Sequence, residues 1–272
     1  MKGTKFMKKI GVVGCGAIGS EICKVINRQG IPCKLVSIYD TDLNKSKLLI
    51  DKLRNRTIKI AKSLKELVNS CDIVFEAATP ATVYELSKIC FPAKKDLFVM
   101  SAGGLIIYPS ILKSAMKYKC NVYYPSGAIC GLDGVRAAAA GKIRSVTLTT
   151  TKPLLSLKDS PGLKKYLSNN NININDIRKI ATIFSGTTEK ATVLFPQNIN
   201  VSAALSLAGI GPRKTNVNIV VDPNGTKNIH QIEVISDSGR IFTRTENVPS
   251  PDNPKTSYLA ILSAISTLKL IV

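Results

Sequence analysis

The glycine spacing between residues 14 and 19 constrains this chain more than any other feature of its sequence. Gly14, Gly16 and Gly19 form the pattern G-x-G-x-x-G, with an apolar run at residues 10–13 before it and apolar residues at helical spacing at 22–26 after it. The first glycine permits a tight turn out of a strand, the second allows the backbone to approach a pyrophosphate, and the third lets the helix pack closely on the sheet. The pattern predicts a strand–turn–helix unit that binds a dinucleotide.

The start of the predicted helix supplies the groups that would contact the phosphates. The first N–H groups of a helix have no partner within it, and the positive end of the helix dipole favours an anion. The expected cofactor contacts in this turn are the three glycines together with Ala17 and Ile18. A glycine-rich turn without a ligand is the alternative, and the strand and helix around the pattern count against it.

An acidic residue stands where the same type of site needs one. Asp40 follows an apolar run at residues 35–38 and comes 21 positions after Gly19. A carboxylate at this position binds the ribose hydroxyls of the adenosine and favours NAD over NADP. Lys45 and Lys47 are close enough in sequence to tolerate a 2′-phosphate, so NADP stays open. A helix-capping or turn role is the structural alternative for Asp40.

The first part of the chain alternates predicted strands and helices. Apolar runs at 10–13, 35–38, 57–60, 73–76, 97–101 and 121–124 are separated by helical patterns that end near residues 53, 69, 90 and 118. This order indicates a Rossmann-type, doubly wound parallel sheet of the α/β class. Ligands of such sheets bind beyond the carboxyl ends of the strands, which adds Ala78 and residues 101–104 to the expected site.

The order of predicted strands and helices changes after Pro125. Residues 144–151, 216–221, 230–236 and 240–246 read as strands, and a turn at 237–239 joins the last two. Few helices interrupt them, so we expect an α+β second domain with a mainly antiparallel sheet. A terminal apolar stripe at Tyr258, Ile261, Leu262, Ile265 and Leu268 predicts a helix that returns to the first domain. The expected domains are 1–124 with 255–272 for the dinucleotide, and 125–254 for the substrate and for dimer formation.

Composition limits the cellular setting and the partners. None of the chain's apolar runs reaches the roughly 18 residues of a membrane span, and we expect no signal peptide and no membrane partner. Seven cysteines without paired spacing, most of them in apolar surroundings, suggest buried thiols in a reducing cytoplasm, and a single histidine argues against a metal site. The net charge of +20 is compatible with nucleic-acid binding, but the lysines are dispersed and favour a solvated basic surface.

Four segments of the second part resemble L-aspartate dehydrogenases. They are PSGAICGLDG at 125–134, LFPQNINVSAALSLAG at 194–209, NIH at 228–230 and ENVPSPDNPKTSYLA at 246–260. The resemblance includes the first domain and implies NAD(P)-dependent oxidation of L-aspartate to iminoaspartate, which hydrolyses to oxaloacetate and ammonia or feeds NAD synthesis. It also implies that His230 is the active-site histidine and that Ala128 and Asn200 contact the dinucleotide. The polar segment at 164–175 departs from the family's compact pattern.

Several of these residues also have a simpler explanation. His230 could be a hydrogen-bonded structural histidine, Asn200 could cap the helix predicted at 201–207, and Ala128 could belong to a plain turn. Lys255, Thr256 and Arg136 are candidates for the substrate carboxylates, although a solvated surface role fits them equally.

Two other functions stay open at this point. The chain could be a dehydrogenase or reductase for another small acid, of the homoserine or dihydrodipicolinate type. It could also be a non-catalytic protein that senses nucleotides. A homodimer is expected by analogy with the fold only.

Overall fold

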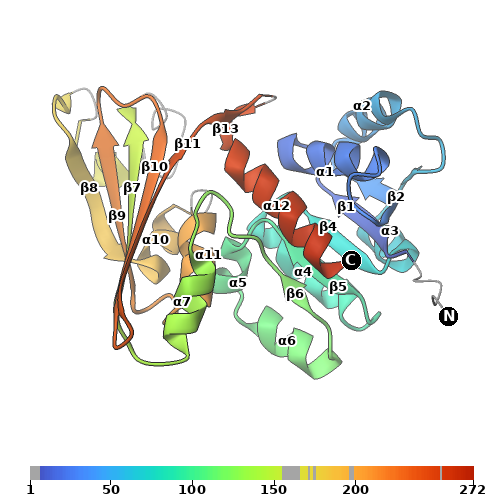
Figure 1. Cartoon of the computed structure of the whole chain (residues 1–272). Coiled ribbons are helices and arrows are strands. Elements are labelled where there is room, and N and C mark those ends of the chain that lie inside the picture. Colours follow the sequence, from blue (N-terminus) through green and yellow to red (C-terminus); the bar gives the residue numbers. More distant parts are fainter. Residues whose placement is uncertain (1–6, 155–165, 171, 174–175, 196–198, 252) are drawn as a thin grey trace. The chain divides into compact units, whose positions relative to one another are not determined.

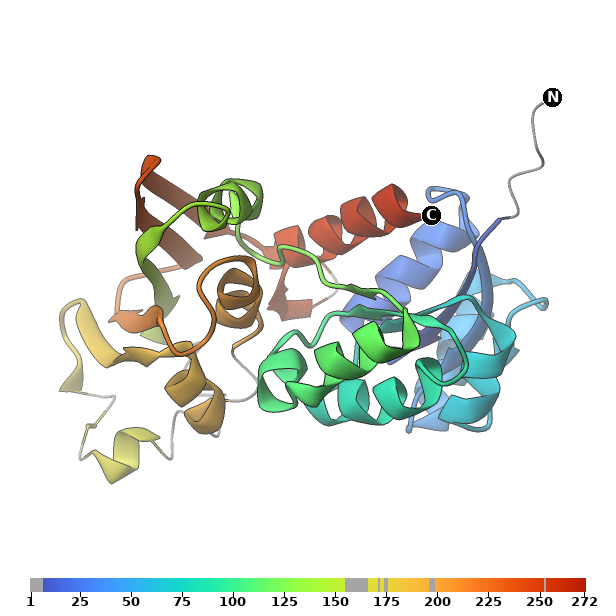
Figure 2. The same cartoon turned by 90° about the horizontal axis from the view of Figure 1, so that it is seen from below.

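The computed structural model describes residues 7–154, 166–170, 172–173, 176–195, 199–251 and 253–272 (Figures 1 and 2). The chain divides into two compact units. Unit 1 comprises Met1–Pro125 and Ile261–Val272, and unit 2 comprises Ser126–Ala260. No helix among the described residues is long and apolar enough to cross a membrane.

A six-stranded parallel sheet forms the centre of unit 1. Its strand order is β3-β2-β1-β4-β5-β6, with each neighbouring pair parallel. The strands are β1 (Lys9–Val13), β2 (Lys34–Tyr39), β3 (Lys59–Ile60), β4 (Ile73–Glu76), β5 (Asp96–Val99) and β6 (Val122–Tyr123). The order reverses direction at β1, which is the topological switch point of a doubly wound sheet. The prediction of a Rossmann-type sheet is confirmed.

Helices cover both faces of this sheet. The helices of unit 1 are α1 (Ala17–Asn27), α2 (Leu43–Leu53), α3 (Leu64–Ser70), α4 (Pro80–Cys90), α5 (Gly103–Ile107), α6 (Ser110–Tyr118) and α12 (Tyr258–Ile271) from Ile261 onward. Helices α1, α2 and α12 share one apolar core with β1, β2, β4 and β5. Helix α3 packs on the opposite face, where Leu67 and Cys71 leave no room for a side chain at Gly11. Figure 2 shows α1 and α12 on one side and α4 and α6 on the other.

Capping residues explain where several of these helices begin. The Asp42 side chain accepts a hydrogen bond from the Asn44 N–H, and the Ser63 hydroxyl accepts one from the Glu66 N–H. Such side-chain acceptors satisfy donors that a helix start leaves unpaired. Helix α2 therefore starts after Asp42.

A five-stranded mixed sheet forms the centre of unit 2. Its order is β11-β10-β7-β9-β8, and all its pairs are antiparallel except β7 with β9. The strands are β7 (Ile143–Pro153), β8 (Ala181–Thr187), β9 (Thr215–Asp222), β10 (Asn228–Ser236) and β11 (Gly239–Asn247). A short pair, β12 (Pro249–Ser250) and β13 (Asn253–Ser257), precedes α12. The expected mainly antiparallel sheet is confirmed, and strand β8 and the β12–β13 pair are additions to it.

Three of the helices described in unit 2 lie on one face of this sheet. They are α7 (Leu132–Ala139), α10 (Thr188–Leu194) and α11 (Asn200–Ala208). Phe184 of β8 and Val221 of β9 belong to an apolar cluster that also contains Ala191 of α10. Buried and half-exposed residues alternate along β7 and β10, so the second face of the sheet carries the more exposed side chains. Figure 1 shows α7, α10 and α11 on the same side of the sheet.

One expectation needs correction, and another falls partly outside the described residues. Tyr258 is 38% and Leu262 is 42% exposed, whereas Ile261, Ala264 and Leu268 form the buried side of α12, so the predicted stripe is wrong at Tyr258 and Leu262. Five cysteines are buried, Cys120 is half-buried and Cys130 is exposed, which agrees with the expectation for most of the thiols. Of the polar segment at 164–175, the structure describes residues 166–170 and 172–173.

Candidate active site

Glycine is required at two positions of the turn between β1 and α1. Gly14 has a φ of +95°, and a Cβ there would lie 2.4 Å from the Ala77 carbonyl oxygen. A Cβ on Gly19 would lie 1.8 Å from the Gly14 carbonyl oxygen, which no real side chain can do. The turn and the close approach of α1 to the sheet therefore exclude larger residues, as the spacing predicts.

The backbone around Gly16 has the features of a phosphate cradle. A Cβ on Gly16 would meet no atom within 4 Å, so the space in front of this residue is open. Gly16 caps α1, and the first N–H to bond back within the helix is that of Ser20, which donates to the Gly16 carbonyl oxygen over 2.9 Å. The N–H groups of Ala17, Ile18 and Gly19 come before that bond, and no acidic residue lies in the first turn. This geometry fits the pyrophosphate of a dinucleotide.

Asp40 is held against the glycine turn. Its Oδ2 accepts a hydrogen bond from the Cys15 N–H over 2.7 Å, and its Oδ1 accepts one from the Asp42 N–H over 2.9 Å. Helix α2 is capped by Asp42, so the capping alternative for Asp40 is wrong, whereas its turn role is real. Each carboxylate oxygen has a second lone pair, which leaves acceptors for ribose hydroxyls.

A buried carboxylate joins the ends of β4 and β5 next to the turn. Glu76 is fully buried and accepts hydrogen bonds from the Ala78 N–H at 2.7 Å, the Ser101 hydroxyl at 2.8 Å and the Ser101 N–H at 3.0 Å. Burial raises the pKa of Glu76, and the hydrogen bonds from Ser101 and Ala78 oppose that shift. Glu76 thereby orients the loop that carries Ala78, an expected cofactor contact. Sequence reasoning did not identify this role.

His230 lies in unit 2 on strand β10 and is only 7% exposed. Its Nδ1 is 3.0 Å from the hydroxyl oxygen of Thr150 on the neighbouring strand β7. Burial first and the positive charge of Lys152 second together lower the pKa of His230 to about 4. The imidazole is therefore neutral near neutral pH, and one ring nitrogen, Nε2, is left for a proton from another molecule.

Strand pairing brings several polar residues to the face of the sheet that carries His230. His230 is opposite Thr150 on β7 and opposite Thr245 on β11, while Asn228 is opposite Asn247. Lys152 follows Thr150 by two positions and shares its face, because side chains alternate along a strand. Thr150, Lys152, Asn228 and His230 are called the His230 cluster below.

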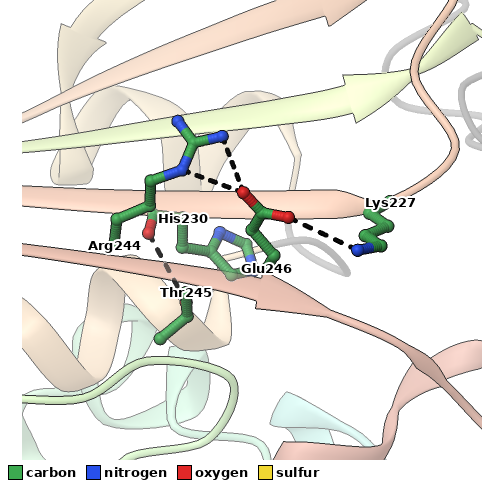
Figure 3. A network of polar contacts seen from close by, with 5 residues as sticks. All are labelled: Lys227, His230, Arg244, Thr245 and Glu246. Carbon is green, nitrogen blue, oxygen red and sulfur yellow. Dashed lines mark hydrogen bonds and ion pairs between the residues drawn. The ribbon is translucent and has the colours of Figure 1, made fainter.

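The other face of β11 carries an ion-pair network (Figure 3). Arg244 Nη2 is 3.0 Å from Glu246 Oε1, and Lys227 Nζ is 3.4 Å from Glu246 Oε2. These hydrogen bonds lower the pKa of Glu246. Thr245, between Arg244 and Glu246 in sequence, places its hydroxyl 3.4 Å from the His230 carbonyl oxygen. Alternation along β11 thus separates these exposed charges from the imidazole.

The loop with Ala128 is fixed to the same sheet. The Ala128 carbonyl oxygen accepts hydrogen bonds from the Thr245 hydroxyl at 2.9 Å and from the Asn247 side-chain amide at 3.0 Å. The Ser257 hydroxyl donates to Asn247 Oδ1 over 2.6 Å and orients that amide. The carbonyl of Ala128 is therefore occupied, and its N–H and methyl group are what it could offer a ligand.

The remaining candidate residues differ in their exposure and in the elements that carry them. Asn200 is exposed and is the first residue of α11, whose N-cap is Ile199, so the capping alternative for Asn200 is wrong. Arg136 is exposed on α7. The side chain of Lys255 lies outside the described residues, and Thr256 is half-buried in β13.

Sequence reasoning missed the other three members of the His230 cluster. Thr150 and Asn228 were within recognised segments but had no assigned role, and Lys152 lies one residue beyond the predicted strand. Thr150 and His230 are 80 positions apart in the chain. Only the pairing of β7 with β10 brings them together.

Comparisons with known proteins agree with these features. The family model "Aspartate dehydrogenase, C-terminal" matches residues 133–271, and the model "Homoserine dehydrogenase, NAD binding domain" matches residues 14–125. An L-aspartate dehydrogenase of Methanococcoides burtonii is 44% identical over 268 residues, which are 97% of each chain. One from Nitrosopumilus maritimus is 41% identical over 97% of this chain and 96% of its own.

A solved structure gives the same fold. The crystal structure of aspartate dehydrogenase from Thermotoga maritima aligns with a TM-score of 0.72 over 97% of this chain and 96% of its own, at 22% sequence identity. The fold agreement is independent of the closer sequence matches, which extend over nearly the whole chain. The chain therefore belongs to the L-aspartate dehydrogenase family.

Proposed function

We propose that this chain oxidises L-aspartate to iminoaspartate with a nicotinamide dinucleotide, and that the imine then hydrolyses to oxaloacetate and ammonia. Family membership supports the substrate, because the relatives at 38–44% identity are L-aspartate dehydrogenases. The observation that carries the proposal is His230, a buried and neutral imidazole that Thr150 orients beside the positive charge of Lys152.

The glycine turn of unit 1 would hold the dinucleotide. Its contacts are proposed to be Gly14, Gly16, Ala17, Ile18 and Gly19 for the pyrophosphate, Asp40 for the adenosine ribose, and Ala78, Ala128 and Asn200 nearer the nicotinamide. When bound, the cofactor supplies the acceptor for the hydride that leaves Cα of the substrate. The carboxylate of Asp40 favours NAD, since a 2′-phosphate would meet a negative charge there.

His230 is proposed to act as the general base. L-aspartate arrives with an ammonium group, and the nitrogen must lose a proton before its lone pair can form the imine. A neutral Nε2 can take that proton, and the hydrogen bond of Nδ1 to Thr150 fixes the ring orientation. After Nε2 has released that proton to solvent, the same nitrogen can deprotonate the water that attacks the imine carbon.

The lowered pKa of His230 gives a pH prediction. An imidazole with a pKa of about 4 is still in its base form at about pH 5. The decrease of kcat/KM in acid that depends on His230 (its acid limb) should therefore occur well below about pH 6.5, the ordinary pKa of histidine. Lys152→Gln removes one of the two causes of the shift and should move this limb to higher pH. The measurement is kcat/KM for L-aspartate as a function of pH, and a wild-type limb near 6.5 would contradict the assignment.

A substrate panel tests the proposed reaction. L-aspartate should produce reduced nicotinamide, oxaloacetate and ammonia in equal amounts at alkaline pH, whereas L-homoserine and the dihydrodipicolinate pair should give no comparable rate. A protein that binds the dinucleotide but turns over none of these substrates would instead be a nucleotide sensor. Activity with homoserine alone would indicate a homoserine dehydrogenase, the enzyme named in the family model that matches residues 14–125.

The cellular setting is part of the same proposal. We infer a cytoplasmic enzyme whose imine product feeds NAD biosynthesis, and a homodimer formed through the more exposed face of the unit 2 sheet. Phe242, which lies on that face of β11, is 55% exposed, and large apolar side chains at this exposure are frequent at subunit interfaces. Sedimentation of the full chain measures the oligomeric state.

A further inference from the structure

We propose that Asn228 and Lys152 recognise the substrate beside His230. Asn228 Oδ1 accepts a hydrogen bond from the substrate's amino group, and Lys152 Nζ binds one of its carboxylates. This inference rests on the proposed oxidation of L-aspartate and names the residues that would select such an amino acid.

Asn228 is the member of the His230 cluster with an unmet hydrogen bond. Among the described residues, its Oδ1 is the one buried side-chain oxygen or nitrogen without a hydrogen-bond partner. A buried polar atom left in this state is unfavourable and therefore calls for an explanation. An amide oxygen only accepts hydrogen bonds, so the missing partner must be a donor, such as an N–H group of a ligand.

The register of the sheet places this acceptor next to the base. Side chains alternate along β10, so Asn228 and His230 share one face and are two positions apart. Ile229 and His230 of β10 pair with Thr151 and Thr150 of β7. The same antiparallel register, continued by one residue, sets Asn228 opposite Lys152. An acceptor, a cation and a base thus occupy adjacent positions on one face.

Lys152 provides the charge that a dicarboxylic amino acid requires. Its charge acts on His230, and burial lowers the pKa of Lys152 itself, so its ammonium lies in a setting of reduced solvation. A carboxylate bound there gains more than it would in water, because charge interactions are stronger where solvent is excluded.

Together the two residues distinguish an amino acid from its analogues. A dicarboxylate such as succinate satisfies Lys152 but has no donor for Asn228, and it would leave the amide oxygen unpaired. L-aspartate satisfies both. Recognition by a buried polar group is selective for this reason: the analogue that lacks the donor leaves the acceptor unmet.

Calorimetric titration in the presence of excess NADH tests the assignment, because NADH allows binding of L-aspartate without turnover. We expect Asn228→Ala to weaken L-aspartate at least about tenfold while changing succinate by less than about twofold, since one hydrogen bond to a charged group corresponds to a factor of this order. Lys152→Gln should weaken both ligands about tenfold or more. Gln231→Ala, on the opposite face of β10, is the matched control and should bind both as the wild type does.

Two further measurements keep the outcome decisive. Asn228→Leu retains the side-chain volume and replaces Asn228→Ala if the smaller residue does not fold, and thermal unfolding verifies each variant. Unchanged L-aspartate binding in a folded Asn228 variant, unchanged succinate binding in Lys152→Gln, or a wild type that binds neither ligand would overturn the inference. A wild type that binds L-aspartate as expected but does not reduce NAD with it would refute the proposed reaction and leave the binding assignment intact.

Discussion

Replacing His230 by glutamine should lower kcat for L-aspartate about 100- to 10,000-fold, the range expected for the loss of a general base. Glutamine keeps much of the volume and can still hydrogen-bond to Thr150, but it cannot take a proton near neutral pH. Dinucleotide binding should not change, because His230 is not among the residues proposed to contact the cofactor. The measurement combines steady-state turnover with a titration of the dinucleotide.

Two variants separate a catalytic loss from a structural one. Thr150→Val removes the hydrogen bond to Nδ1 but leaves the imidazole, so it should lower kcat less than His230→Gln does and should not abolish the acid limb of the pH profile. Gln231→Ala should behave as the wild type. If His230→Gln kept turnover within about threefold of wild type, well short of the effect of a lost base, His230 would have no part in proton transfer.

Two glycine variants should fail in different ways. Gly19→Ala places a Cβ 1.8 Å from the Gly14 carbonyl oxygen, so α1 must move away from the sheet, and the free energy of unfolding should fall by about 3 kcal/mol or more. Gly16→Ala meets no atom within 4 Å and has an ordinary φ of −74°, so its stability should stay close to wild type. The added methyl group would fill the space proposed for the pyrophosphate, so dinucleotide affinity should fall at least about tenfold.

Urea unfolding and dinucleotide titration on the same preparations measure both effects. The two variants serve as controls for each other, because each adds one methyl group to the same turn. A Gly16→Ala protein that is stable and binds the dinucleotide as tightly as the wild type would show that the phosphates lie elsewhere. A Gly19→Ala protein of wild-type stability would contradict the close packing of α1.

Local signals explain why unit 1 is the more predictable part. The glycine turn, the Asp42 and Ser63 caps and the start of α4 at Pro80 are each encoded within a few residues, and parallel strands alternating with helices leave few possible topologies. The short helix α5 was not anticipated, because Gly103 and Gly104 at its start suggest a loop.

Unit 2 depends on contacts between distant segments, which a single sequence records poorly. Strand β8 ends at Thr187, and helix α10 begins at the next residue. The side chain of Thr187 caps this helix. No apolar period marks that boundary. The prediction for α12 was wrong at Tyr258 and Leu262, which are exposed, and it left out Ala264, a small residue that is buried.

The residues of the candidate site also differ in how far local sequence predicts them. The glycines and Asp40 were predictable because their spacing carries the geometry, and His230 was found through the family resemblance. The partners of His230 were not, since Thr150 and Lys152 reach it only through the register of β7 with β10. The unmet hydrogen bond of Asn228 is a property of the folded chain alone.

A crystal structure of the full chain with NADH and L-aspartate tests the central claim most directly. The account predicts that Nε2 of His230 lies within about 3.2 Å of the substrate's amino nitrogen, or reaches it through one water, which is the range in which a base can take a proton. An L-aspartate molecule bound beside the nicotinamide with the His230 imidazole out of reach of both its nitrogen and its Cα would contradict the account.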